Sequence, residues 1–159
     1  MLGFKKAPAI DFQPKYLMAG ISISDPSSPV PLFVYGTLKP GEFFYPHYCE
    51  GHVVAEQAAI VRGQLFALPL GYPALAEGGD WVYGYLLSLR SAAALQKIDA
   101  LEDYDAQRPV RENEYYRVEI EVFDLQQNSL GKAWTYLMEI KRIQVLRGQW
   151  LPKGIWTGS

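Results

Sequence analysis

Alternating apolar and polar positions in several stretches of the chain predict a strand-rich fold. The clearest case is residues 114–123, where one face is apolar and the other carries Arg117, Glu119 and Glu121. A polar turn at 126–129 separates this stretch from the next, so we expect a β-hairpin there. The strands expected from such patterns cover residues 30–34, 53–68, 81–89, 114–123 and 131–138.

Glycines and prolines interrupt these strands at defined places. Gly63 and Gly84 lie inside two of them, which indicates a tightly curved sheet or a close backbone crossing, with Gly63 a candidate bulge position. Two clusters, 69–73 and 77–80, are rich in turn-forming residues. We therefore expect a break at the first cluster and a turn at the second, directly before the strand at 81–89.

A helical period replaces the strand pattern after Ser91, a residue type that caps helix N-termini. The helix is expected to run to about Glu102 or Tyr104. At ~100° per residue, Leu95 and Ile98 define its apolar stripe, and Glu102 projects between them. The sequence therefore places a carboxyl group on the apolar face of this helix.

Burying an ionised carboxylate without a partner is costly. Burial would raise the pKa of Glu102 toward the range in which a carboxyl group exchanges protons near neutral pH. Alternatively, the helix ends before Glu102 and its side chain turns into water. Asp99 is a second acid, at the edge of the same helix face.

The chain leaves its first expected strand through a glycine loop, Tyr35-Gly36-Thr37-Leu38. Gly36 permits close approaches that a side chain would forbid, and Pro40-Gly41 then turns the chain. Backbone N–H groups at Gly36, Thr37 and Leu38 can hold an anion or a polarised carbonyl. An ordinary exit from a strand is the alternative reading.

Composition limits the classes of function. The 159 residues, 49% hydrophobic and 20% charged, suit one globular domain. The net charge of -2 argues against nucleic acid as the main partner. Aromatic residues make up 14% of the chain, with Tyr the main contributor, and either line a pocket or fill the core. No apolar run approaches the ~20 residues of a membrane span. Cys49 is the single cysteine, which excludes an internal disulfide. A cytoplasmic location is therefore expected.

The ends of the chain are the least regular parts. Residues 1–29 contain four prolines and are expected to form an N-terminal arm or linker, with the domain covering 30–159. Residues 42–52 predict a short irregular helix or an aromatic loop, whereas 139–159 support no assignment. The order strand, loop, strands, helix, hairpin indicates an α+β fold with a mostly antiparallel, barrel-like sheet.

Other chemistries have weaker support. His47, Cys49 and His52 are potential metal ligands or a Cys–His pair, but their spacing matches no strong zinc motif and nothing marks Cys49 as an activated nucleophile. The loop after Gly36 lacks the glycine spacing of a phosphate-binding P-loop. No metal or cofactor is therefore expected.

The order of several segments resembles the γ-glutamylcyclotransferase-like family, in its γ-glutamylamine cyclotransferase and AIG2-like branch. Val34-Tyr35-Gly36-Thr37-Leu38-Lys39-Pro40-Gly41 is similar to the family's opening signature, and residues 98–104 resemble its aliphatic-Asp-x-x-Glu-Gly segment. Further similar segments, in the family's order, are 63–65, 72–73, 82–86 and 115–118. Asp103 departs from the family by standing where glycine is common, and Gly148-Gln149-Trp150 matches a family Gly-Asp-Trp only in part.

This resemblance implies a small mixed barrel flanked by helices and a site for γ-glutamyl compounds. Glu102 would be the general acid and base, and the loop Tyr35-Gly36-Thr37-Leu38 would bind the γ-glutamyl group, with Tyr116 as a further substrate-binding candidate. The implied reaction is intramolecular acyl transfer on a γ-glutamyl amine or amide, which releases 5-oxoproline and a free amine without a metal, nucleotide or covalent intermediate. The small-molecule substrate would be a γ-glutamylamine or related conjugate.

Two other readings stay open. The same scaffold could bind a small acidic metabolite without turning it over, because fold does not determine function. The aromatic segment Phe43-Phe44-Tyr45 could instead serve a protein-interaction module, which an exposed apolar patch would support.

Overall fold

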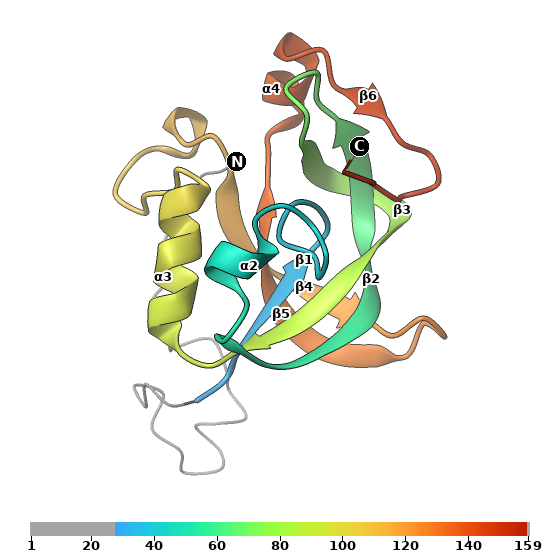
Figure 1. The fold of residues 1–159 in the computed structure, drawn as a ribbon. Coiled ribbons are helices and arrows are strands. Elements are labelled where there is room, and N and C mark those ends of the chain that lie inside the picture. The colour runs from blue at the N-terminus through green and yellow to red at the C-terminus, as the bar shows by residue number, and fades with distance from the viewer. Residues whose placement is uncertain (1–27, 159) are drawn as a thin grey trace.

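Six strands form a single sheet in the computed structural model, which describes residues 28–158 (Figure 1). The strands are β1 (Val30–Val34), β2 (Val53–Ala67), β3 (Pro73–Leu89), β4 (Tyr116–Phe123), β5 (Ser129–Leu137) and β6 (Gln149–Trp150). The helices are α2 (Tyr45–Tyr48), α3 (Ala92–Leu101) and α4 (Ile140–Val145), with a 3-10 turn at Val110–Glu112. The expected N-terminal arm lies almost wholly outside the described residues.

The strands are arranged in the order β3-β1-β5-β4-β2-β6, and β3 also pairs with β2. The pairing of β1 with β5 is parallel, at Leu32 and Trp134, and the other pairings are antiparallel. The predicted α+β class, the mostly antiparallel mixed sheet and the hairpin of β4 and β5 are therefore confirmed. A barrel needs β4 and β2 to be joined along their length, and their pairing consists of one bridge, Ile60 with Phe123. The expected barrel therefore stays a prediction.

Both faces of β1 are buried, which explains its uninterrupted apolar sequence. Leu32 and Val34 belong to the core shared with α3, whereas Phe33 packs into a second core on the opposite face. At Gly84 on β3 a Cβ atom would collide with the Val34 carbonyl oxygen and the Phe33 ring. The predicted close approach at this glycine is therefore present.

The turn predicted at residues 77–80 is wrong. These residues lie within β3, where the register passes from Asp80 opposite Gly63 to Ala76 opposite Gln64, so three residues bulge from the strand. Arg62 Nη1 donates to the bulged Gly79 carbonyl at 2.9 Å. The chain reverses earlier, at 68–72, where the predicted break supplies the turn between β2 and β3.

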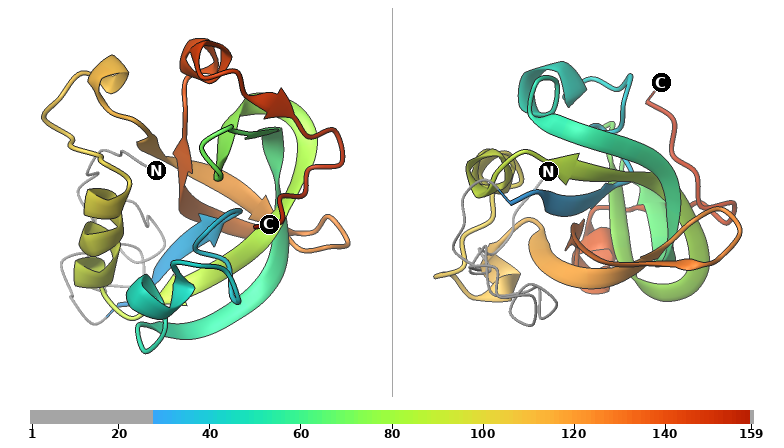
Figure 2. Two further views of the ribbon diagram at one scale, coloured as in Figure 1. Left: turned by 45° about the horizontal axis from the view of Figure 1, so that its top comes forward. Right: turned by 90° about the horizontal axis from the view of Figure 1, so that it is seen from below.

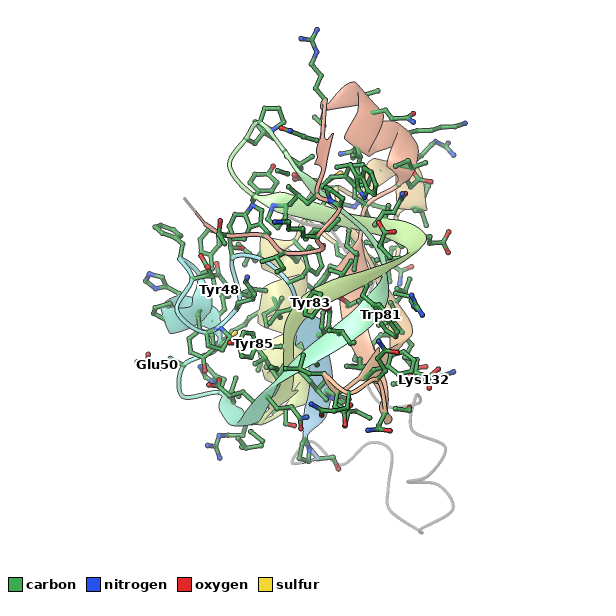
Figure 3. All side chains as sticks on the ribbon, turned by 90° about the vertical axis from the view of Figure 1, so that its right-hand side faces the viewer. Tyr48, Glu50, Trp81, Tyr83, Tyr85 and Lys132 are labelled. Carbon is green, nitrogen blue, oxygen red and sulfur yellow. The ribbon has the colours of Figure 1, made fainter. Side chains whose placement is uncertain are left out.

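The helices lie around the sheet without forming a complete layer (Figures 1 and 2). Helix α3 stands beside the sheet, and α2 lies next to the loop after β1. Helix α4 and β6, in the segment without a predicted element, lie together at the end of the molecule that carries the β2–β3 turn. Figure 3 shows the side opposite α3, where Trp81, Tyr83 and Tyr85 follow one another along β3. The tyrosines thus divide between the surface and the core.

Candidate active site

The loop after β1 is held by its own backbone and by the C-terminal segment. The amide of Lys39 donates to the Gly36 carbonyl at 3.0 Å, and that of Phe44 donates to the Thr37 carbonyl at 2.9 Å. Lys39 Nζ donates to the carbonyl oxygen of Trp156 at 2.7 Å. These contacts fix the loop in a folded turn, so its backbone is arranged before any ligand arrives.

Helix α3 ends next to this loop. Ser91 accepts a hydrogen bond from the Ala94 amide, as the predicted N-cap, and Glu102 is the C-cap residue. The alternative reading of the helix end is half right, because the helix stops at Leu101, but Glu102 does not turn into water: only 2% of it is exposed. Its Oε2 atom is buried without a hydrogen-bond partner.

One cavity brings the predicted residues together. Its lining consists of Phe33, Val34, Tyr35, Gly36, Thr37, Leu38, Pro73, Glu102 and Tyr136. Glu102 therefore shares the cavity with all four residues of the predicted binding loop. Burial raises the pKa of Glu102 well above its ordinary value, and the carboxylates of Glu114 and Asp99 also raise it. This arrangement puts a carboxyl group of high proton affinity beside a turn of backbone amides.

The chain leaves α3 through a residue with a left-handed backbone. Asp103, which departs from the glycine of the resembled motif, has φ +56, in the left-handed region that glycine favours. Its amide donates to the Ala100 carbonyl and that of Tyr104 to the Asp99 carbonyl, which closes the helix end. Arg108 Nη2 contacts the Asp103 carbonyl oxygen at 2.6 Å and Oδ1 at 3.1 Å. The chain thus turns sharply at the end of α3 without a glycine.

A buried ion pair next to Glu102 was missed from the sequence. Arg117 Nη1 lies 3.2 Å from Asp99 Oδ2, and the Arg117 side chain is only 1% exposed. The guanidinium also lies 4.8 Å from the ring centre of Trp134. Strand alternation placed Arg117 on the polar face of β4. The one sequence feature that could have indicated its burial was Asp99, the acid at the edge of the apolar face of α3.

Tyr116 is not brought into the cavity. It lines a separate hollow with Glu77 and Glu139, and its pKa is raised to about 12, by burial and then by those two carboxylates. The preceding residue, Tyr115, is fully buried and donates through its hydroxyl to the Pro73 carbonyl at 2.6 Å. Neighbouring residues of an extended chain point to opposite faces. Tyr115, rather than the predicted Tyr116, is therefore the tyrosine whose pKa the charge of Glu102 raises.

The remaining candidates from the sequence lie elsewhere. Cys49 is fully buried, and burial raises its pKa to about 12, so the thiol is neutral. Within residues 28–158, no three His, Cys, Asp or Glu side chains gather as a metal site. Phe43 is 75% exposed, but Phe44 and Tyr45 pack against the core, so the aromatic segment exposes one ring rather than a patch.

The chain belongs to the γ-glutamyl cyclotransferase, AIG2-like family, whose sequence model matches residues 32–157. A curated relative, the γ-L-glutamyl-butirosin B γ-glutamyl cyclotransferase of Niallia circulans, is 35% identical over 106 residues. The match covers 67% of this chain and 65% of the relative, so it leaves about a third of that protein unmatched.

Solved structures show the same fold. The crystal structure of YkqA from Bacillus subtilis has a TM-score of 0.57 at 20% identity, over 80% of this chain and 39% of that one. A mouse AIG2-like protein has a TM-score of 0.54 at 21% identity, over 70% and 78%. Protein ytfP from Escherichia coli has a TM-score of 0.51 at 26% identity, over 80% and 96%.

In the part of the chain that the structure describes, no helix combines the length and apolarity that a membrane crossing requires.

Proposed function

We propose that this protein catalyses intramolecular acyl transfer on γ-glutamyl amines or amides, releasing 5-oxoproline and a free amine. The observation that carries the proposal is the Glu102 carboxyl group, buried, with Oε2 unpartnered, in the cavity formed by the Tyr35–Leu38 loop. Family membership and the Niallia circulans relative support the same reaction class. Glu102 is the proposed general acid and base.

The first step requires a base. The α-amine of a γ-glutamyl group is an ammonium ion at neutral pH, and it attacks only after losing a proton, which the Glu102 carboxylate accepts. The amine nitrogen then forms a bond to the γ-carbonyl carbon of the same molecule and closes a five-membered ring. Holding the substrate folded lowers the entropic barrier to this closure.

The second step requires an acid. Collapse of the tetrahedral intermediate breaks the bond between the γ-carbon and the leaving nitrogen, and protonated Glu102 returns its proton to that nitrogen. The raised pKa of Glu102 suits both steps, because it makes the carboxylate a stronger base for the ammonium ion and keeps the accepted proton on Glu102 until the leaving nitrogen takes it. In all, the α-nitrogen loses two protons and the leaving nitrogen gains two on becoming an ammonium ion. Glu102 carries the first proton, and the second passes from the ring nitrogen to the released amine as the intermediate collapses, so the enzyme ends the cycle unchanged.

The loop supplies the electrostatic part of the mechanism. Among the described residues, the amides of Gly36 and Leu38 donate to no backbone acceptor. In the proposed complex these amides anchor the substrate α-carboxylate or stabilise the oxyanion of the intermediate. Their fixed position means that little reorganisation is needed when charge develops.

The proposed substrate is a γ-glutamylamine or related γ-glutamyl conjugate rather than glutathione. The Tyr-Gly-Thr-Leu-Lys signature at 35–39 supports this branch, and the Niallia circulans relative is named for a γ-glutamyl conjugate of butirosin B. Tyr116 is not included among the substrate-binding residues of this proposal, because its hollow is separate.

The test is a panel of γ-glutamyl amines, amides and glutathione, with 5-oxoproline as the readout. Glu102→Gln keeps the size of the side chain but removes the base, and should lower turnover by ~10²–10⁴-fold. Glu121→Gln, at an exposed position of β4, is the matched control and should retain full turnover. Release of 5-oxoproline by Glu102→Gln at the wild-type rate would refute the role of Glu102. Saturable binding without product from any substrate would favour the metabolite-binding alternative.

A further inference from the structure

Four buried or half-buried tyrosines surround the Glu102 carboxyl group, and each hydroxyl donates its hydrogen elsewhere. The hydrogen bonds run from Tyr35 to the Tyr136 carbonyl (2.6 Å), from Tyr72 to Glu114 Oε2 (2.8 Å), from Tyr115 to the Pro73 carbonyl (2.6 Å) and from Tyr136 to Asp99 Oδ1 (3.0 Å). Burial raises the pKa of all four phenols, and the charge of Glu102 raises it further. The phenols therefore stay protonated, yet none donates to Glu102.

Tyr136 is the most informative of the four. It lines the same cavity as Glu102, and its acceptor, Asp99, lies three residues before Glu102 on α3. Residues three apart in a helix share a face, so Asp99 and Glu102 are two acids within reach of one region of the core. The hydroxyl goes to Asp99.

The ion pair with Arg117 explains why the Tyr136 hydroxyl donates to Asp99 and not to Glu102. A buried carboxyl group stays ionised when a cation lies beside it, and an ionised acceptor forms the stronger hydrogen bond. Asp99 has Arg117 at 3.2 Å, whereas burial favours the neutral form of Glu102. Asp99 is thus the better acceptor of the two.

We propose that Asp99 is a positioning residue: by accepting the Tyr136 hydroxyl, it keeps this donor away from Glu102 and leaves that carboxyl group able to take a proton from the substrate. A phenol donating to Glu102 would stabilise the carboxylate and weaken it as a base. The inference deepens the proposed function, on which the catalytic meaning of Glu102 rests.

The groups whose charge acts on Glu102 must be accounted for in any test. Among the described residues, the carboxylates of Asp99 and Glu114, on α3 and in the segment before β4, raise the pKa of Glu102. The neutral phenols that face its charge are Tyr35 in the loop after β1, Tyr72 in the β2–β3 turn, Tyr115 before β4, and Tyr136 on β5. Arg117, on β4, acts through Asp99. The variants below change only Asp99 and Tyr136, so the other groups stay constant.

The experiment titrates Glu102 directly in the full chain by ¹³C NMR of carboxyl-labelled glutamate, with the signal assigned by its loss in Glu102→Gln. Asp99→Asn should lower the apparent pKa of Glu102 by about one unit, through the freed hydroxyl and the unbalanced Arg117. Adding Tyr136→Phe to Asp99→Asn removes the freed hydroxyl alone, and should raise the pKa again by about half a unit. Equal titrations of the single and double variants would overturn the proposal, because the hydroxyl would then not reach Glu102.

Tyr136→Phe alone provides a test should Asp99→Asn not fold. It should leave the pKa of Glu102 within about 0.3 unit of wild type, because the hydroxyl is already committed to Asp99. A clear rise would show that Tyr136 donates to Glu102 in solution and would overturn the proposal. The titration needs no turnover, so it separates this inference from the reaction. If the variants titrate as expected but the protein forms no 5-oxoproline, the proposed function is refuted and this inference stands. If the enzyme is active, the acid limb of its kcat/KM profile should move with the pKa of Glu102 in each variant.

Discussion

Gly36 lies directly against Pro73, the first residue of β3. A Cβ atom at Gly36 would come within 2.5 Å of Pro73 Cγ and 2.9 Å of Cδ, closer than atoms of a folded protein approach without displacement. The proline ring cannot rotate away, and its carbonyl oxygen accepts the Tyr115 hydroxyl. The proposed binding loop is therefore in contact with the first residue of β3, which also lines the cavity.

Replacing Gly36 by Ala should disturb both stability and catalysis. Overpacking of this kind costs about 1–3 kcal/mol in the free energy of unfolding, and a displaced loop should lower kcat/KM by about tenfold or more. Gly79→Ala is the control, because a Cβ atom there would meet nothing within 4 Å. Urea unfolding and the 5-oxoproline assay measure the two effects. Equal behaviour of the two variants would contradict the contact with Pro73.

The sequence predicted the two groups of residues that meet in the cavity, the loop at 35–38 and Glu102, because each depends on a local signal. The apolar run before Gly36 indicates a strand and its exit, and the helical period after Ser91 carries Glu102 to the apolar face. Both signals lie within about one element, where periodicity is informative. Asp99 was also placed near this face.

The missed features depend on contacts between distant parts of the chain. Arg117 is buried because it meets Asp99 and Trp134, and alternation along β4 contains no information about those partners. The glycine cluster at 77–80 has the same composition whether it forms a turn or a bulge, and pairing with β2 determines that it is a bulge. Strand β6 has only two residues, so its partner in β2 defines it.

Asp103 allows a test of how the chain ends α3 without glycine. Its left-handed backbone is unfavourable for most residues, while its contacts with Arg108 are exposed and contribute little. We expect Asp103→Gly to unfold within about 0.5 kcal/mol of wild type, and Asp103→Ala to lose about 1 kcal/mol. Thermal and urea unfolding compare the variants. Equal stability of the alanine and glycine variants would show that the left-handed turn does not limit this helix end.

Cys49 should be unreactive in the folded protein. The thiolate is the reactive form, and the thiol is fully buried with its pKa raised to about 12, by burial and then by Glu56. We expect a disulfide reagent such as DTNB to modify no thiol in the native protein at pH 8 and one thiol per chain after unfolding in urea. Modification of the native protein at the rate of a free thiol would show that this region opens readily. The rate of slow labelling would report local or global opening.

The raised pKa of Glu102 makes the stability of the fold depend on pH in a predictable direction. The folded-state pKa lies above the unfolded value, so between the two values the native state holds the proton more tightly. The contribution of Glu102 to stability is therefore fully present below the unfolded pKa and is lost as pH rises through the folded pKa.

Glu102→Gln should remove this dependence, because the amide stays neutral. The stability of the variant relative to wild type should rise with pH across that interval, by about 1.4 kcal/mol for each unit between the two pKa values, and then level off. Urea unfolding at a series of pH values measures it, and Glu121→Gln, at its exposed position, should follow the wild-type curve. A constant difference between Glu102→Gln and wild type at every pH would mean that the carboxyl group titrates alike in the folded and unfolded chain. The burial that makes Glu102 a suitable base would then not operate in solution, and the catalytic proposal would lose its physical basis.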